Sequence, residues 1–260
     1  MAFTVHAVMP GVWHIVDCMG VCMTLLEGEN AAMLVDTGYG IEDVADFMRH
    51  MTDLPLTVFL THNHHDHAMG ARCFPETYML EADMADWRMF TDDKMRRRVL
   101  TQAIGKNLPV DEKTFLAGEI PLPKVMKPGV IDLGGLTAEI IEAPGHTPGS
   151  AVDVPERKLL LSGDDWNPCT WLFFPQALGL REYRSNMRGI QQLPFEKVLC
   201  PHREALYDRW MFDDFFNALT DGNLRAAEPV NIAPYEQIDT CQATLPHDQV
   251  LVFDWAKSGL

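Results

Sequence analysis

Short apolar runs separated by polar and glycine-containing turns make up much of this 260-residue chain. Apolar runs bounded by turn residues predict buried strands, whereas apolar positions spaced three and four apart predict helices. The expected strands are 12–16, 23–26, 31–35, 56–60, 136–141, 151–154, 158–161, 197–199 and 249–253. The expected helices are 41–51, 81–104, 180–193 and 208–219, and residues 105–129, which hold four prolines, are expected to form an irregular loop.

Residues 61–67 read Thr-His-Asn-His-His-Asp-His, directly behind a predicted buried strand. Imidazole and carboxylate groups are the ligands of zinc and similar divalent metals. A solvated His-rich loop or a tag is the alternative, but tags occur at termini and this run is internal. Residues two apart in an extended chain point the same way, so His62 and His64 can hold one ion. Asp66 and His67 follow where the chain turns and can reach a second ion.

The pattern His-x-His-x-Asp-His fits in this register only, which leaves His65 on a variable position. It resembles the metallo-β-lactamase superfamily of metallohydrolases, over about residues 10–205. The resemblance implies an α+β fold, a four-layer αββα sandwich, with the site at the edge where the strands end. We expect one domain over residues 1–260, completed by a helix and a strand in 206–260.

By the same resemblance, later segments supply the remaining ligands. His146, in Gly-His-Thr-Pro-Gly-Ser, would be the third histidine of the first site, although alone it would be read as a turn residue. Asp164 follows Gly163 and would be the bridging carboxylate, which leaves Asp165 to cap the next turn. His202 would be the last ligand of the second site, although alone it would be a surface residue and the family's flanking glycines are missing.

The implied site holds two zinc ions, with iron or manganese as other options. The first ion would be held by His62, His64 and His146, the second by Asp66, His67 and His202, with Asp164 between them. Two residues are expected to orient ligands: Asp36, which alone reads as a helix N-cap or turn residue, and Thr147. Redox di-iron relatives usually carry Glu at the position of His64, so this chain favours zinc.

The expected reaction is hydrolysis of an activated carbonyl in a thioester, lactone, ester or β-lactam, by hydroxide held between two metals. Asp66 is expected to accept a proton. A mononuclear iron oxidoreductase of the persulfide dioxygenase kind is the alternative, and a metal-binding protein without catalysis is a third class. The glyoxalase II branch binds its substrate through C-terminal basic residues, and we find no matching cluster here.

The composition argues against nucleic acids and membranes as binding partners. A net charge of −16 disfavours nucleic acids, because like charges repel. No apolar stretch has the length of a membrane span, and the N-terminus does not resemble a signal peptide. We expect a cytoplasmic enzyme acting on a small molecule, with no membrane partner and six reduced cysteines. The oligomeric state is open, with a homodimer as one option.

The substrate pocket is expected to have aromatic walls. The predicted lining residues are Trp166, Trp171 and Phe173, which follow the bridging acid, and Tyr183 in the helix at 180–193. The alternative is that they belong to the core or to a subunit interface. In the helical segment 81–104, Met84, Trp87 and Met95 could form a lid, but a stripe at helical spacing is more often core.

Overall fold

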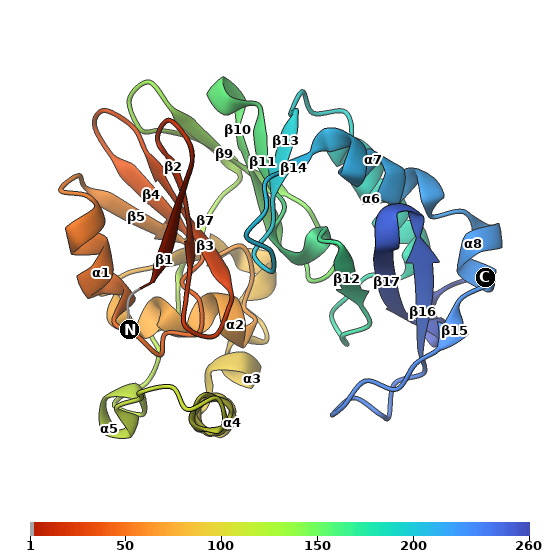
Figure 1. The fold of residues 1–260 in the computed structure, drawn as a ribbon, viewed down its shortest axis with the longest axis horizontal. Coiled ribbons are helices and arrows are strands. Elements are labelled where there is room, and N and C mark those ends of the chain that lie inside the picture. Colours follow the sequence, from red (N-terminus) through yellow and green to blue (C-terminus); the bar gives the residue numbers. More distant parts are fainter. Residues whose placement is uncertain (1–2) are drawn as a thin grey trace.

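The computed structural model describes residues 3–260, and within them two large β-sheets pack against each other (Figure 1). The first sheet has its described strands in chain order: β1 (Thr4–Met9), β2 (Val12–Val16), β3 (Cys22–Glu27), β4 (Ala32–Val35), β5 (Leu56–Phe59), β6 (Tyr78–Leu80) and β7 (Lys124–Met126). Strands β1 to β4 are antiparallel neighbours, whereas β4 to β7 run parallel.

The second sheet is formed by strands from the later part of the chain. In spatial order they are β14 (Tyr207–Asp208), β13 (Lys197–Leu199), β11 (Leu159–Leu161), β10 (Ser150–Val154), β9 (Thr137–Glu142) and β8 (Gly129–Asp132). Strands β11 and β13 are parallel and the other neighbours are antiparallel.

Both faces of each sheet are apolar, and strand periodicity explains how. Successive residues of a strand point to opposite faces. In β11, Leu159 and Leu161 pack in the core between the sheets, and Leu160 packs in the outer cluster. In β4, Met33 faces the other sheet and Leu34 faces outward. Uninterrupted apolar strands of this kind require a covering layer on both sides.

Helices supply these outer layers, which completes a four-layer αββα sandwich. The first sheet is covered by α1 (Val44–Met51), α3 (Trp87–Thr91), α4 (Asp93–Gly105) and α5 (Glu112–Phe115), with the short α2 (His65–Ala68) next to it. The second sheet is covered by α6 (Leu180–Ile190), α7 (Arg209–Ala218) and α8 (Asp221–Arg225). None of the helices described is long and apolar enough to cross a membrane.

A third, smaller sheet packs against α6 and α7 at the C-terminal end of the chain (Figure 1). Its strands, in spatial order, are β12 (Cys169–Leu172), β17 (Gln249–Asp254), β16 (Thr240–Leu245) and β15 (Glu228–Pro229). Leu172, Leu251 and Phe253 of this sheet share one core cluster with Tyr183 and Phe212 of the helices. Residues 206–260 therefore contribute more than the helix and strand predicted, since they build most of this sheet.

The structure corrects two further expectations. Residues 105–129 are not an irregular loop, because α5 and β7 lie within them. The segment 81–104 is helical as predicted, but it contains both α3 and most of α4. Trp87 is buried, and Met84 and Met95 pack against the same cluster. The stripe is therefore core, as the alternative interpretation had it.

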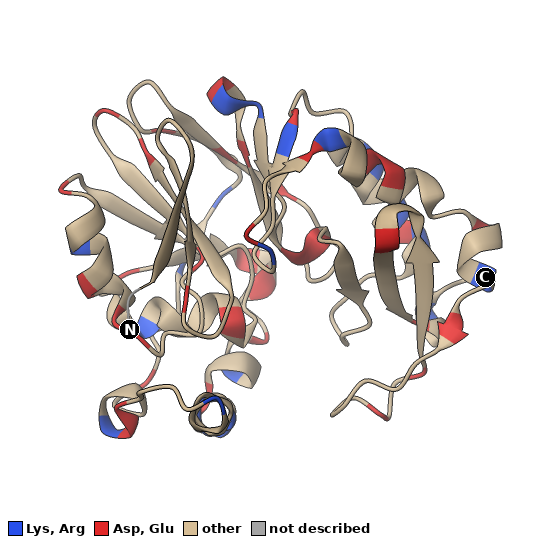
Figure 2. Cartoon of the chain, in the orientation of Figure 1, with Lys and Arg blue, Asp and Glu red and all other residues tan. Residues whose placement is uncertain are grey.

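Positions of Lys and Arg alternate with positions of Asp and Glu along the chain (Figure 2). Figure 2 shows blue and red segments interspersed over helices and connections, while the strands of the two large sheets are mostly uncharged. The six cysteines are free thiols, and Cys22, Cys200 and Cys241 are buried.

Candidate metal centre

The ends of parallel strands bring the candidate ligands together. Strands β4 and β5 are parallel neighbours, so Asp36 behind β4 meets residues 61–67 behind β5. Strands β11 and β13 are also parallel neighbours, so Asp164 and His202 lie beyond adjacent strand ends of the second sheet. His146 lies in the turn between β9 and β10, and the backbone N–H and hydroxyl of Ser150 donate to the Thr61 carbonyl at 3.1 and 3.0 Å.

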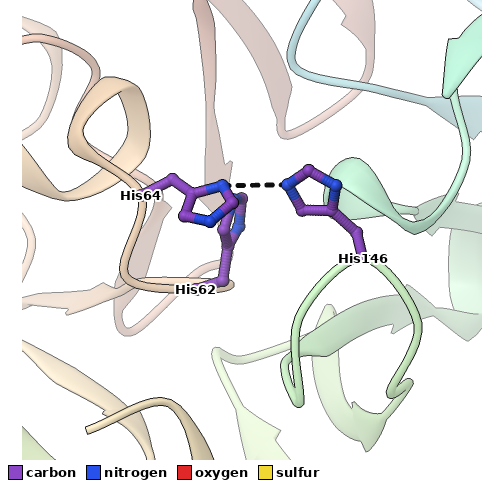
Figure 3. Close-up of side chains that lie close together, drawn as sticks. All are labelled: His62, His64 and His146. Carbon is purple, nitrogen blue, oxygen red and sulfur yellow. Dashed lines mark hydrogen bonds between the residues drawn. The ribbon is translucent and has the colours of Figure 1, made fainter. Parts of the chain in front are cut away.

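The first ligand set consists of three buried histidines. The rings of His62 and His64, from the loop after β5, face that of His146, from the turn between β9 and β10 (Figure 3). One ring nitrogen from each lies within 4.8 Å of the other two, which is close enough for a single ion to contact all three. Nδ1 of His64 and Nε2 of His146 are 2.9 Å apart.

The second set comprises Asp66, His67 and His202, whose ligand atoms also lie within 4.8 Å of one another. Asp164 lies between the two sets. Its Oδ2 is 3.6 Å from Nε2 of His146, 3.5 Å from Nε2 of His67 and 3.0 Å from Nε2 of His202. One carboxylate oxygen is thus close to both sets, which is the position that a bridging ligand requires.

Two choices left by the motif are decided by geometry. Asp165 turns away from the ligand sets, and its Oδ1 accepts the backbone N–H of His146 at 2.8 Å. Gly145 is required there, because a Cβ atom would lie 2.5 Å from that carboxylate oxygen. His65 belongs to none of the potential ligand groups found among the described residues, and its ring packs against Tyr39 at 5.5 Å.

In three of the histidine rings, the hydrogen-bond partner of Nδ1 shows that Nε2 is the nitrogen free to bind a metal. Nδ1 of His67 contacts Asp36 Oδ2 at 3.0 Å, Nδ1 of His62 contacts the Thr61 hydroxyl at 3.0 Å, and Nδ1 of His146 contacts a backbone carbonyl at 2.5 Å. A neutral imidazole that donates from Nδ1 keeps a lone pair on Nε2. Among the residues that the structure describes, none is a hydrogen-bond partner of the buried Nε2 atoms of His62 and His67. These orphaned nitrogens and the facing acids fit one or more divalent cations.

Asp36 lies beneath the histidine loop, as the resemblance implied. Besides its contact with His67, its carboxylate accepts the backbone N–H of Thr61 at 2.7 Å and the Thr61 hydroxyl at 2.9 Å. Asp36 has φ of 65°, a left-handed conformation that costs a residue with a side chain about 1–3 kcal/mol. Thr147 accepts the N–H of Gly149 at 3.1 Å, so it stabilises the turn that carries His146 without contacting the imidazole.

Burial and charge shift the pKa values of the candidate ligands in both directions. Burial would lower the pKa of His67 and His202, but neighbouring carboxylates outweigh it and raise the pKa of both, so a metal ion would displace protons there. Burial lowers the pKa of His62, His64 and His146, so these imidazoles stay neutral and can act as ligands. Burial would raise the pKa of Asp66, but the nearby histidines outweigh it and hold that pKa at about 2. Asp164 behaves in the same way, with its pKa well below the usual range.

A cavity of about 480 Å³ opens next to the ligands. Of the four aromatic residues predicted to line a pocket, only Trp171 does so. Trp166 is fully buried and donates from Nε1 to Gln249 at 3.2 Å. Phe173 is buried behind the cavity wall, and Tyr183 packs beneath Gly145. Trp166, Phe173 and Tyr183 lie in the core instead, in the cluster that joins the second sheet to its covering helices.

Several cavity residues were not predicted. Phe90, Phe174 and Tyr235 add aromatic surface, and Arg98 of α4 adds a positive charge. Phe174 lies in the aromatic stretch that the sequence made conspicuous, but it follows the end of β12, so strand alternation could not have selected it. The other three come from distant segments and carry no motif.

Comparison with known proteins agrees with this geometry. A family model described as the metallo-beta-lactamase superfamily matches residues 16–202. A search of curated proteins found no significant match. A metallo-beta-lactamase family protein from Thermus thermophilus is 20% identical, with a TM-score of 0.60 over 85% of this chain and 82% of the other.

Two further solved structures have similar folds. The stereoselective inverting sec-alkylsulfatase Pisa1 from Pseudomonas sp. is 15% identical, with a TM-score of 0.64 over 86% of this chain and 42% of the other. The metallo-beta-lactamase FIM-1 from Pseudomonas aeruginosa, solved in a mono-zinc form, is 16% identical, with a TM-score of 0.57 over 82% of this chain and 92% of the other. At such identities the likeness shows the fold alone. Because the family model spans most of the chain, this protein belongs to the metallo-β-lactamase superfamily and is a metal-dependent hydrolase of that superfamily.

Proposed function

We propose that this protein is a binuclear zinc hydrolase that attacks activated carbonyl groups. The observation that carries the proposal is the position of Asp164, whose Oδ2 is within 3.6 Å of ring nitrogens from both ligand sets. A carboxylate shared in this way suits a pair of ions better than a single ion. Iron and manganese accept the same ligand types, so zinc is the proposed metal on the strength of the histidine-rich first set.

The chain's own residues would divide the work between binding and proton transfer. When bound, the two ions would supply Lewis acidity and lower the pKa of water towards neutrality. The nearby histidines keep the pKa of Asp66 low, so its carboxylate is ionised at neutral pH. Its position beside His67 and His202 would let it receive the proton of the attacking water. Asp36 orients the imidazole of His67 and Thr61 orients that of His62. These contacts would keep the ligand geometry fixed during the reaction.

The cavity supports a small substrate with an apolar part. Phe90, Trp171, Phe174 and Tyr235 offer aromatic surface beside the ligands, and pockets of this volume and lining bind small molecules. An ester, thioester, lactone or β-lactam fits this description. The net charge of −16 makes a nucleic acid a poor partner, and we propose none.

The test is a substrate panel run on zinc-reconstituted protein, with His65→Ala as a matched control for His62→Ala. We expect hydrolysis of at least one carbonyl class, loss of that activity on chelation or with His62→Ala, and retention with His65→Ala. Cleavage of a bis-phosphodiester with every carbonyl substrate untouched would overturn the proposal. Purification with one iron ion per chain, together with persulfide oxidation and no hydrolysis, would instead support the dioxygenase alternative.

A further inference from the structure

His64 is the one ligand of the first set that presents Nδ1, not Nε2, to the other two. Its Nδ1 is 2.9 Å from Nε2 of His146 (Figure 3). Its Nε2 points the other way and lies 2.8 Å from the amide nitrogen of Gln176. If Nδ1 keeps its lone pair for a metal, the ring hydrogen must be on Nε2, because a neutral imidazole carries only one. An amide nitrogen facing that N–H would set donor against donor.

The amide of Gln176 can resolve this conflict by a half-turn about its Cγ–Cδ bond. The half-turn exchanges nitrogen and oxygen, so that Oε1 takes the place beside His64 Nε2 and accepts its hydrogen. Where the amide oxygen now lies, no residue within 3–260 is its hydrogen-bond partner. The contact with His64 is therefore the one that decides which amide atom faces inward.

The segment that carries Gln176 is fastened from the C-terminal end of the chain. Nζ of Lys257 donates to the carbonyls of Phe174, Pro175 and Ala177, at 3.0, 2.8 and 3.1 Å. Phe174 also packs on the His64 ring, with ring centroids 4.7 Å apart. An ammonium group that binds three carbonyl acceptors around one residue fixes the backbone from which the Gln176 side chain extends.

We propose that Gln176 is a positioning residue for the metal centre: its Oε1 accepts a hydrogen bond from His64 Nε2–H and so keeps Nδ1 free as a ligand, and Lys257 holds Gln176 in place. His62, His67 and His146 each have such an outward partner, and Gln176 gives His64 one as well. The inference rests on the proposed metal binding. It gives the C-terminal segment a role in the metal centre, which the family motif does not reach.

The experiment compares Gln176→Leu and Gln176→Glu, measuring zinc affinity by competition with a chromophoric chelator. Leucine removes the acceptor, and loss of an outer partner of a metal-binding histidine typically weakens affinity about 10–100-fold. Glutamate accepts but cannot donate, so Gln176→Glu should bind zinc at least as tightly as the wild type. Gln192→Leu, at an exposed position in the turn after α6, is the control and should leave the zinc affinity unchanged.

A second readout follows the His64 ring itself. Imidazole ¹⁵N shifts, assigned by comparison with His64→Ala, should report hydrogen on Nε2 in the zinc-loaded wild type and in Gln176→Glu. Lys257→Met should weaken zinc binding in the same direction as Gln176→Leu, with circular dichroism confirming the fold.

The outcomes separate the two proposals. A wild type that binds zinc tightly, with Gln176→Leu binding equally well, would overturn the role of Gln176 and leave the hydrolase proposal intact. Weakening by Gln176→Glu to the extent seen with leucine would show that the amide acts as a donor, which also overturns it. A wild type that binds no zinc would overturn both.

Discussion

Asp83 is a buried acid beside the metal loop, and replacing it with asparagine should stabilise the protein at alkaline pH. The residue is 1% exposed, and its backbone carbonyl accepts from the side chain of Asn63 at 2.6 Å. Burial raises the pKa of its carboxyl from 3.8 to about 7, although the nearby Thr147 hydroxyl lowers it, and the charge of Asp86 raises it further. Asparagine has nearly the same shape and no charge to bury.

The size of the effect follows from proton linkage. Between pH 3.8 and about 7 the unfolded carboxyl is ionised while the folded one stays protonated, so raising the pH favours the unfolded chain. The loss is about 1.36 kcal/mol per pH unit until the folded pKa is reached, after which it levels off. Between pH 5 and pH 8 the wild type should therefore lose about 3 kcal/mol of stability that Asp83→Asn does not lose.

The assay is urea unfolding of chelator-treated protein, followed by circular dichroism at pH 5, 6, 7 and 8. The quantity compared is the free energy of unfolding of Asp83→Asn minus that of the wild type, so every other titrating group cancels. Asp53→Asn, at an exposed position, controls for the loss of one negative charge. A difference that stays flat from pH 5 to pH 8 would refute the reasoning, whatever its sign.

The other predictions concern the site and the core. His202→Ala should lose part of the bound metal and most of the turnover while keeping its circular dichroism spectrum. His65→Ala should match the wild type in all three measurements. An empty metal site in His65→Ala would show that the motif register is wrong. Trp171→Ala should raise KM more than it lowers kcat in steady-state assays, because its side chain lines the cavity while its backbone carbonyl still contacts Nδ1 of His146; an unchanged KM would place the substrate elsewhere. Phe253→Ala should cost about 3–5 kcal/mol in urea unfolding, because the ring is 1% exposed in the third sheet's core; a cost below about 1 kcal/mol would contradict that packing.

The sequence predicted the fold best where both faces of a strand are buried. The expected strands 158–161 and 197–199 each consist of one lysine followed by a short apolar run, and the structure has strands at Leu159–Leu161 and Lys197–Leu199. Strand β1 was missed because it lies at a sheet edge and mixes exposed and half-buried positions. Strand β16 was missed because Thr240–Leu245 alternates polar and apolar residues too weakly to stand out.

The candidate site was predictable to the extent that it is local in sequence. Residues 61–67 form a contiguous motif, and the structure brings the ligands proposed from it together. His202 was found despite its altered flanks, because a strand end supplies the position whether or not glycines follow. Gln176 and Arg98 had no sequence signal, since their proximity to the site depends on how distant segments pack.

The count of metal ions per chain tests the central claim most directly. Elemental analysis of zinc-supplemented protein, after removal of loosely bound ions, should give two ions per chain, because Asp164 lies within reach of both ligand sets. The same measurement on His202→Ala should give a lower count, while His65→Ala should retain two. One ion or none in the wild type would contradict the binuclear site on which the proposed chemistry depends.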